Sequence, residues 1–171
     1  MNDYKSKKTK QHIWTFLFSK LIASLGISIY SFGISFYILS VTGSALSFAI
    51  NLILNVLPRT LISPIVGYMA DKYNKKVIIV SSQFGTALAM ILLLLYSLAN
   101  GMSLYAIYTA TAFVSMTSAF SSSTFNAAIP NLVDKENIQK AMSFNQISIS
   151  LATIGGPTIG GLLYGFLSLP V

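Results

Sequence analysis

The stretch VIIVSSQFGTALAMILLLLYSL, residues 77–98, contains no charged side chain, and it decides the class of fold. It lies in a longer uncharged segment, residues 77–133, and residues 21–58 and 141–171 are also free of charge. About 20 consecutive apolar residues suffice for a helix to cross a bilayer core. The three segments therefore predict several transmembrane helices.

The overall composition excludes several other classes of protein. Of 171 residues, 54% are hydrophobic and 9% charged, whereas a soluble domain carries about 25% Asp, Glu, Lys and Arg. There is no cysteine and a single histidine, His12, so a disulfide framework, a thiolate metal site and a cysteine nucleophile are excluded. We expect no cofactor and no enzymatic activity, because no nucleophile, base and orienting group can be assembled at membrane depth.

Two turn signals divide the uncharged segments into five predicted spans. Thr42-Gly43-Ser44 interrupts the first segment and Asn100-Gly101 interrupts residues 77–133. The predicted fold is an all-α integral membrane protein whose transmembrane helical domain covers residues 16–167. Its predicted spans are residues 16–39, 45–69, 77–98, 104–125 and 141–167, with a basic amino terminus at 1–15, loops at 70–76 and 126–140, and a truncated end at 168–171.

The distribution of basic residues predicts the topology. The chain has 11 Lys plus Arg against 4 Asp plus Glu, a net charge of +7. Nucleic-acid binding would require a basic face with interleaved aromatic residues, but here the lysines cluster before the first span, after the second and after the fourth. Because positive loops stay inside, we expect a multi-pass protein of the plasma membrane with its amino terminus and both charged loops in the cytoplasm. The clusters are Lys5, Lys7, Lys8 and Lys10; Lys72, Lys75 and Lys76; Lys135 and Lys140.

Hydroxyl side chains recur at helical spacing on one face of the first span and one face of the fourth. Such residues often serve close helix packing or bond to their own helix, and packing is the commoner reading of either face alone. Alternatively, they line a water-filled cavity, where nearby aromatic rings would suit an amphipathic ligand. The candidate cavity-lining residues are Ser28, Tyr30, Ser31 and Ser35 in the first span and Ser115 and Ser118 in the fourth.

A guanidinium lies near the middle of the second span. Asn51, Asn55 and Arg59 stand four residues apart on one face, and Arg59 is about 18 Å from Asp71 along the helix. An arginine at that depth costs at least about 2.5–3.5 kcal/mol unless it faces water or partners. All four acids, Asp3, Asp71, Asp134 and Glu136, lie outside the predicted spans. The counter-charge of Arg59 is therefore solvent, a ligand or another chain, or else backbone carbonyls and hydroxyls satisfy it.

The second span is followed by GYMADKYNKK, residues 67–76. This sequence resembles the signature loop of the major facilitator superfamily, in which Gly, two residues, a small residue, Asp, a basic residue, any residue and Gly precede two basic residues. The matching residues are Gly67, Asp71, Lys72, Lys75 and Lys76. Asp71 can cap a helix or pair with a cation. Asn74 replaces the family's second glycine, and since asparagine tolerates positive φ, we expect the turn to survive.

The fifth span contains a second motif of the same superfamily. Gly156, Pro157, Gly160 and Gly161 resemble the antiporter motif of its drug exporters. Proline bends a helix and the glycines allow close packing. The same residues also fit an ordinary dimerisation face.

The resemblance extends from the first span to the fifth and is strongest to the drug and macrolide efflux branch. It implies a cavity lined by the first and fourth spans, an outer third span, and a cytoplasmic gate in which Asp71 locks against the second half. That superfamily has twelve spans in two halves, so we expect this chain to be most of an amino-terminal six-helix half, requiring a carboxy-terminal half or a second chain. An arginine that many proton antiporters carry in the fourth span has no counterpart here.

These features predict efflux of a small amphipathic compound or drug by alternating access, and hence antibiotic resistance. The expected partners are the lipid bilayer and a small-molecule substrate. A stand-alone five-span accessory or dimerising protein without transport activity is the alternative.

Overall fold

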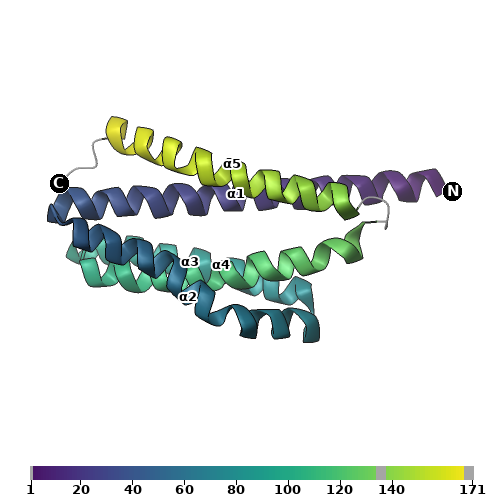
Figure 1. The fold of residues 1–171 in the computed structure, drawn as a ribbon, viewed down its shortest axis with the longest axis horizontal. Coiled ribbons are helices and arrows are strands. Elements are labelled where there is room, and N and C mark those ends of the chain that lie inside the picture. Colours follow the sequence, from purple (N-terminus) through teal and green to yellow (C-terminus); the bar gives the residue numbers. More distant parts are fainter. Residues whose placement is uncertain (1, 134–137, 168–171) are drawn as a thin grey trace. The chain divides into compact units, whose positions relative to one another are not determined.

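The computed structural model describes residues 2–133 and 138–167, which form five α-helices and no strand (Figure 1). This confirms the predicted all-α fold class. The helices are α1 (Asn2–Thr42), α2 (Ala45–Lys72), α3 (Lys75–Asn100), α4 (Leu104–Leu132) and α5 (Ile138–Leu167).

Three of the described helical segments are long and apolar enough to cross a membrane, judged by length and composition. They are Phe18–Thr42, Ala45–Lys72 and Lys75–Asn100. The other two helices, α4 and α5, carry Ser, Thr and Gly along their length. That α4 and α5 also span the bilayer remains a prediction.

The helices extend beyond the predicted spans at several ends. α1 begins at Asn2 instead of residue 16, α2 continues to Lys72, α4 continues to Leu132 and α5 begins at Ile138. Helical hydrogen bonds do not end where hydrophobicity ends, so a helix of a membrane protein can continue into water. Residues 134–137 and 168–171, which belong to the predicted second charged loop and the end of the chain, lie outside the described residues.

Both expected helix breaks have positive-φ glycines. Gly43 (φ +60°) follows α1, and the side chain of Ser44 accepts the amide of Ser47 at the start of α2. Gly101 (φ +77°) follows α3, and its amide donates to the Ser97 carbonyl. Glycine adopts positive φ without steric cost, so these residues reverse the chain within a few residues.

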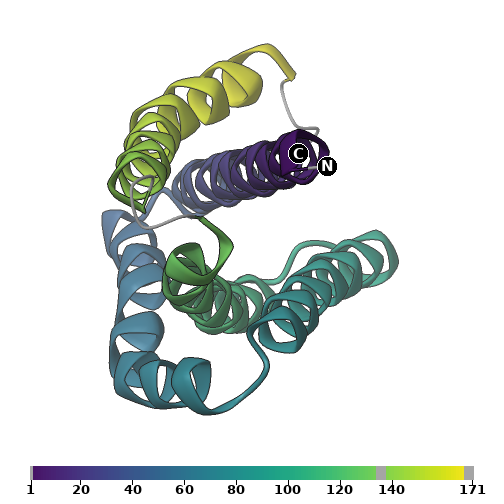
Figure 2. The ribbon, with the colours of Figure 1, turned by 90° about the vertical axis from the view of Figure 1, so that its right-hand side faces the viewer.

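The helices divide into two compact units. The first combines α1 up to Gly33 with α5 and the chain from Ile129 onward, and the second contains residues Ile34–Ala128. Within the second unit, α2 curves along its length (Figure 2), and Pro58 and Pro64 lie inside it. Proline removes a helical hydrogen bond and bends the helix, which accounts for the curvature.

Candidate functional site

A buried hydrogen bond links the end of α1 to α2. Asn51 is completely buried, and its Nδ2 donates to Ser35 Oγ over 2.8 Å. Ser35 is completely buried as well. The sequence singled out both residues separately as cavity-lining candidates, and the structure places them in direct contact.

Side chains of α4 bond to the backbone of α2 at two levels. The hydroxyl of Tyr108 donates to the Ser47 carbonyl over 3.1 Å, and Ser115 Oγ donates to the Asn55 carbonyl over 2.6 Å. α2 and α4 run in the same direction between these two bonds, so Asn51 and Thr111 lie between them. Asn51 Oδ1 and Thr111 Oγ1 are buried there without a hydrogen-bond partner among the described residues.

Another pair of contacts joins α3 to the opposite side of α4. Thr86 Oγ1 lies 2.7 Å from Thr117 Oγ1, and Gln83 Nε2 donates to Ser121 Oγ over 3.5 Å. Neither Thr86 nor Tyr108 was a candidate from the sequence. The spacing of Thr86, one helical turn after Ser82, was the sequence signal that could have indicated a polar face on α3. Ser118 bonds to its own helix, at the carbonyls of Val114 (2.7 Å) and Ser115 (3.0 Å).

The glycine motif of α5 packs against α1 in the first unit. A Cβ added at Gly156 would overlap the Cβ of Ser28 and lie 3.0 Å from the Ser28 carbonyl carbon, and one added at Gly160 would lie 3.2 Å from the Ile29 oxygen. At Gly161 the nearest such contact is 3.9 Å, to the ring of Phe32. Gly156 and Gly160 are therefore the points of closest approach between these helices.

The remaining candidates of the first span are half-buried. Tyr30 and Ser31 both make interactions in the structure. Their role in a cavity wall stays a prediction.

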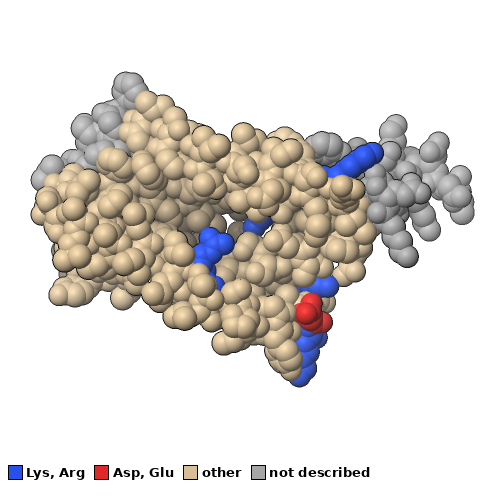
Figure 3. Space-filling model, in the orientation of Figure 1, with Lys and Arg blue, Asp and Glu red and all other residues tan. Residues whose placement is uncertain are grey.

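Arg59 is exposed near the middle of α2. It forms no ion pair or hydrogen bond within the part of the chain that the structure describes. Asn55, one turn earlier, is partly buried and donates from Nδ2 to the Asn51 carbonyl over 3.1 Å. Figure 3 shows a mostly uncharged face with a few separate groups of Lys and Arg.

The connection between α2 and α3 is shorter than the predicted loop, since only Tyr73 and Asn74 lie outside the helices. A short turn is present there, as expected, but Asn74 does not use positive φ: its φ is −64°, and its side chain accepts the Lys76 amide over 3.0 Å as the N-cap of α3. Asn74, and not Asp71, thus caps a helix here. Gly67, Asp71, Lys72 and Lys76 are exposed, and Lys75 is half-buried.

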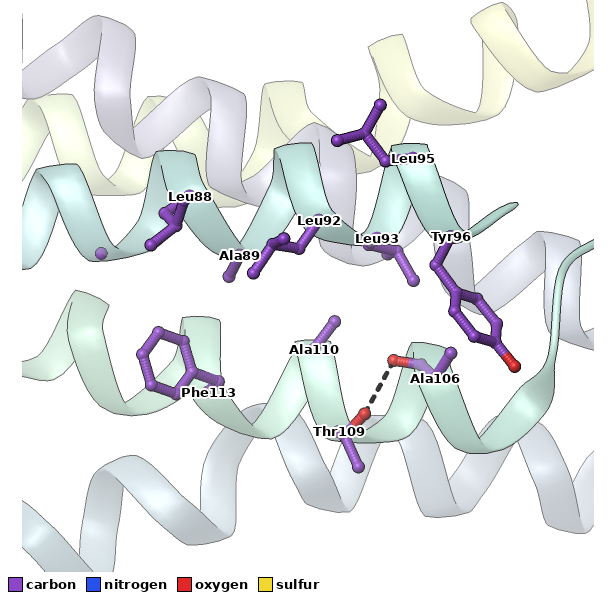
Figure 4. Close-up of a pocket in the computed structure, with 11 residues that line it drawn as sticks. Leu88, Ala89, Leu92, Leu93, Leu95, Tyr96, Ala106, Thr109, Ala110 and Phe113 are labelled. Carbon is purple, nitrogen blue, oxygen red and sulfur yellow. Dashed lines mark hydrogen bonds between the residues drawn. The ribbon is translucent and has the colours of Figure 1, made fainter. Parts of the chain in front are cut away.

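An apolar groove of about 650 Å³ runs between α3 and α4 in the second unit (Figure 4). None of its lining residues was a site candidate from the sequence. They are Gly85, Leu88, Ala89, Leu92, Leu93, Leu95, Tyr96, Ala106, Thr109, Ala110 and Phe113.

Long apolar helices, joined by hydrogen bonds of hydroxyl and amide groups, define an integral membrane protein. Over residues 6–169 the sequence matches a family of the major facilitator superfamily described as transmembrane secretion effectors, and the chain belongs to that family. The motifs at residues 67–76 and 156–161 had indicated the same superfamily.

Several curated proteins are similar to this chain. The macrolide efflux protein A of Streptococcus pyogenes is 27% identical over 165 residues, 96% of this chain and 40% of that protein. The MFS-type transporter YfiS of Bacillus subtilis is 25% identical over 95% of this chain and 38% of its own length. The enterobactin exporter EntS of Shigella dysenteriae is 31% identical over 97 residues, 57% of this chain and 23% of the exporter. The chain thus spans at most about 40% of the length of these relatives. No solved structure matches significantly.

Proposed function

We propose that this chain is the amino-terminal part of a secondary exporter that moves a small amphipathic compound out of the cell by alternating access. The observation that carries the proposal is the family match over residues 6–169, together with relatives named as efflux and export proteins. The macrolide efflux protein aligns with 96% of this chain, so a macrolide is tested beside amphipathic compounds of other charge.

The packing of each unit supports this mechanism. Alternating access is largely a rocking of rigid bundles around a central site. In the second unit, Asn51 links α2 to α1, Ser115 links α4 to α2, and the Thr86–Thr117 contact links α3 to α4. In the first unit, the glycines of α5 pack closely against α1. Helices joined in this way are suited to move as bodies.

The exposed loop between α2 and α3 supplies the gate in this proposal. With the amino terminus in the cytoplasm, Asp71 stands on the cytoplasmic side in the last turn of α2, where it is exposed. A carboxylate there is free to engage cations or helix amides of a second half. Arg59, Asn55, Asn51, Ser28, Tyr30, Ser31, Ser35, Ser115 and Ser118 remain the candidates for the cavity wall.

The alternative, a dimerising protein that uses the glycine face of α5, has less support. Gly156 and Gly160 of that face already contact Ser28 and Ile29 of α1. A second copy would have to displace α1 to reach them.

Drug accumulation tests the proposed function. The full-length gene of the transporter that contains this chain, including its carboxy-terminal half, is expressed in a host without its own drug pumps, and uptake of a radiolabelled macrolide and of several amphipathic dyes is followed with and without an uncoupler. Lower accumulation than in the empty host is the expected result, and the uncoupler shows whether the difference depends on the proton-motive force. Unchanged accumulation of every compound, with the protein present in the membrane, would reject transport.

A further inference from the structure

Arg59 is the only arginine of the chain, and it lies about 20 Å from either end of α2 (Ala45–Lys72). An exposed guanidinium at that depth is unfavourable in lipid, so it faces water or a partner. The hydrogen bonds and charges around Arg59 limit which partner its guanidinium can have.

Three backbone carbonyls near Arg59 accept hydrogen bonds from other side chains. The Asn51 carbonyl accepts Asn55 Nδ2, the Asn55 carbonyl accepts Ser115 Oγ, and the Val56 carbonyl accepts Thr60 Oγ1 over 2.9 Å. Pro58 leaves the Leu54 carbonyl without its helical amide, yet Arg59 does not bond to it. The guanidinium therefore keeps its five N–H donors for a group from outside the described chain.

The charges of the sequence indicate what that group is. Residues 21–58, 77–133 and 141–171 contain no acid, and Asp71 is about 18 Å away along α2. A cationic ligand would find no carboxylate of this chain at this depth and would meet the positive charge of Arg59. A planar guanidinium instead binds carboxylates through two parallel hydrogen bonds.

We propose that Arg59 binds the carboxylate of an amphipathic organic anion, the substrate class that this site takes. The inference rests on the proposed function, because the anion would be the exported compound. An oxyanion of a lipid headgroup has the same chemistry, but headgroups lie at the membrane surface and Arg59 at mid-depth.

A pair of probes that differ only in charge tests the proposal. The chain is placed in phosphatidylcholine nanodiscs, and binding of 4-(1-pyrenyl)butyrate and of the uncharged 4-(1-pyrenyl)butanol is measured against empty nanodiscs. Hydrogen bonds to charged groups are the stronger ones, so we expect the carboxylate to bind at least about tenfold more tightly. Arg59→Gln should remove this preference and Arg59→Lys should retain part of it. The matched control Lys140→Gln, which removes an exposed cation of α5, should leave it intact.

A second measurement needs no variant. Phenylglyoxal modifies arginine but also attacks the terminal amino group, so the mass of the proteolytic peptide that contains residue 59 is used to report modification of Arg59, the single arginine of the chain. Pyrenylbutyrate should slow the modification at least about threefold and pyrenylbutanol should not, since only the carboxylate occupies the guanidinium. Equal protection by both probes, or equal binding of pyrenylbutyrate to wild type and Arg59→Gln, overturns the proposal.

Nanodiscs containing phosphatidylglycerol separate the two sources of the oxyanion. If that lipid alone protects Arg59 and removes the preference for pyrenylbutyrate, the occupant is a headgroup and the substrate assignment is wrong. If protection by pyrenylbutyrate persists, the assignment stands. Binding requires no transport, so binding of the anion by this chain combined with failure of the full-length protein in the accumulation assay refutes the proposed export and not the site.

Discussion

Gly156 of α5 lies against the backbone of Ser28 in α1 so closely that no Cβ fits between the two helices. The carbonyl carbon and Cα of Ser28 stand 3.0 and 3.2 Å from the position that such an atom would take. Backbone cannot move aside as a flexible side chain can, so the contact fixes how α5 packs on α1. The glycine motif therefore packs two helices of the same chain against each other.

A series of alanine substitutions measures this contact. Gly156→Ala should destabilise the protein by about 1–3 kcal/mol, because an extra carbon in a packed interface forces a backbone shift. Gly160→Ala should cost less, since its nearest contact is 3.2 Å, to a single carbonyl oxygen. Unfolding in mixed micelles, followed by far-UV ellipticity, gives the free energies.

The control for that series is Gly161→Ala. A Cβ there would meet only the Phe32 ring at 3.9 Å, an ordinary contact, and alanine favours a helix over glycine by up to about 1 kcal/mol. We therefore expect no loss of stability. Equal costs at Gly156 and Gly161 would contradict the close approach.

The hydrogen bond between Asn51 and Ser35 can be isolated with a double-mutant cycle of Asn51→Ala and Ser35→Ala. Hydrogen bonds between membrane helices contribute about 0.6 kcal/mol on average, with a maximum of about 1.7. We expect a coupling in this range, toward the upper end because both residues are fully buried. The matched cycle pairs Asn51→Ala with Thr60→Ala, an exposed residue bonded to its own helix. Its coupling should be close to zero.

The sequence predicted the helical class and the helix breaks at Gly43 and Gly101 because these follow from hydrophobicity and from backbone sterics, which are local. It could not pair Ser35 with Asn51, since helical spacing shows which side chains share a face but not which helix that face meets. The same limit applied to Ser115, whose partner is a backbone carbonyl of α2 and carries no sequence signal. At Asn74 the family pattern suggested a glycine-like turn, whereas the side chain accepts the Lys76 amide at the start of α3.

The cap at Asn74 predicts a specific ranking of substitutions. Asn74→Ala should cost about 0.5–2 kcal/mol, because the Lys76 amide loses its acceptor, whereas Asn74→Ser and Asn74→Asp should be nearly neutral. Asn74→Gly should cost only a few tenths of a kcal/mol more than these. Stability is measured in the same micelle titration. If the free energy of unfolding of Asn74→Ala equalled that of the wild type, the observed cap would contribute nothing to stability.

The absence of cysteine in the sequence permits a direct test of topology. Tyr73 lies between α2 and α3 and is 55% exposed, and Met102 lies between α3 and α4 and is 41% exposed. With the lysine-rich side in the cytoplasm, a membrane-impermeant maleimide added to intact cells should label Met102→Cys and spare Tyr73→Cys. Permeabilised cells should label both. The reverse pattern in intact cells would place the amino terminus outside.

Asp71→Asn tests the proposed gate. The amide keeps the size of the side chain and removes its charge, so contacts with cations or helix amides of the opposing half weaken. If these contacts contribute about 1.4 kcal/mol to the closed state, transport should fall about tenfold. Efflux of the compound identified in the accumulation assay is the measurement, and Asp71→Glu should restore part of the activity. Met102→Cys should be labelled in the same pattern with Asp71 and with Asp71→Asn, because the lysines that set the topology are unchanged. Normal efflux by Asp71→Asn at normal protein levels would remove Asp71 from the gate and leave the lysines of the loop with a topological role alone.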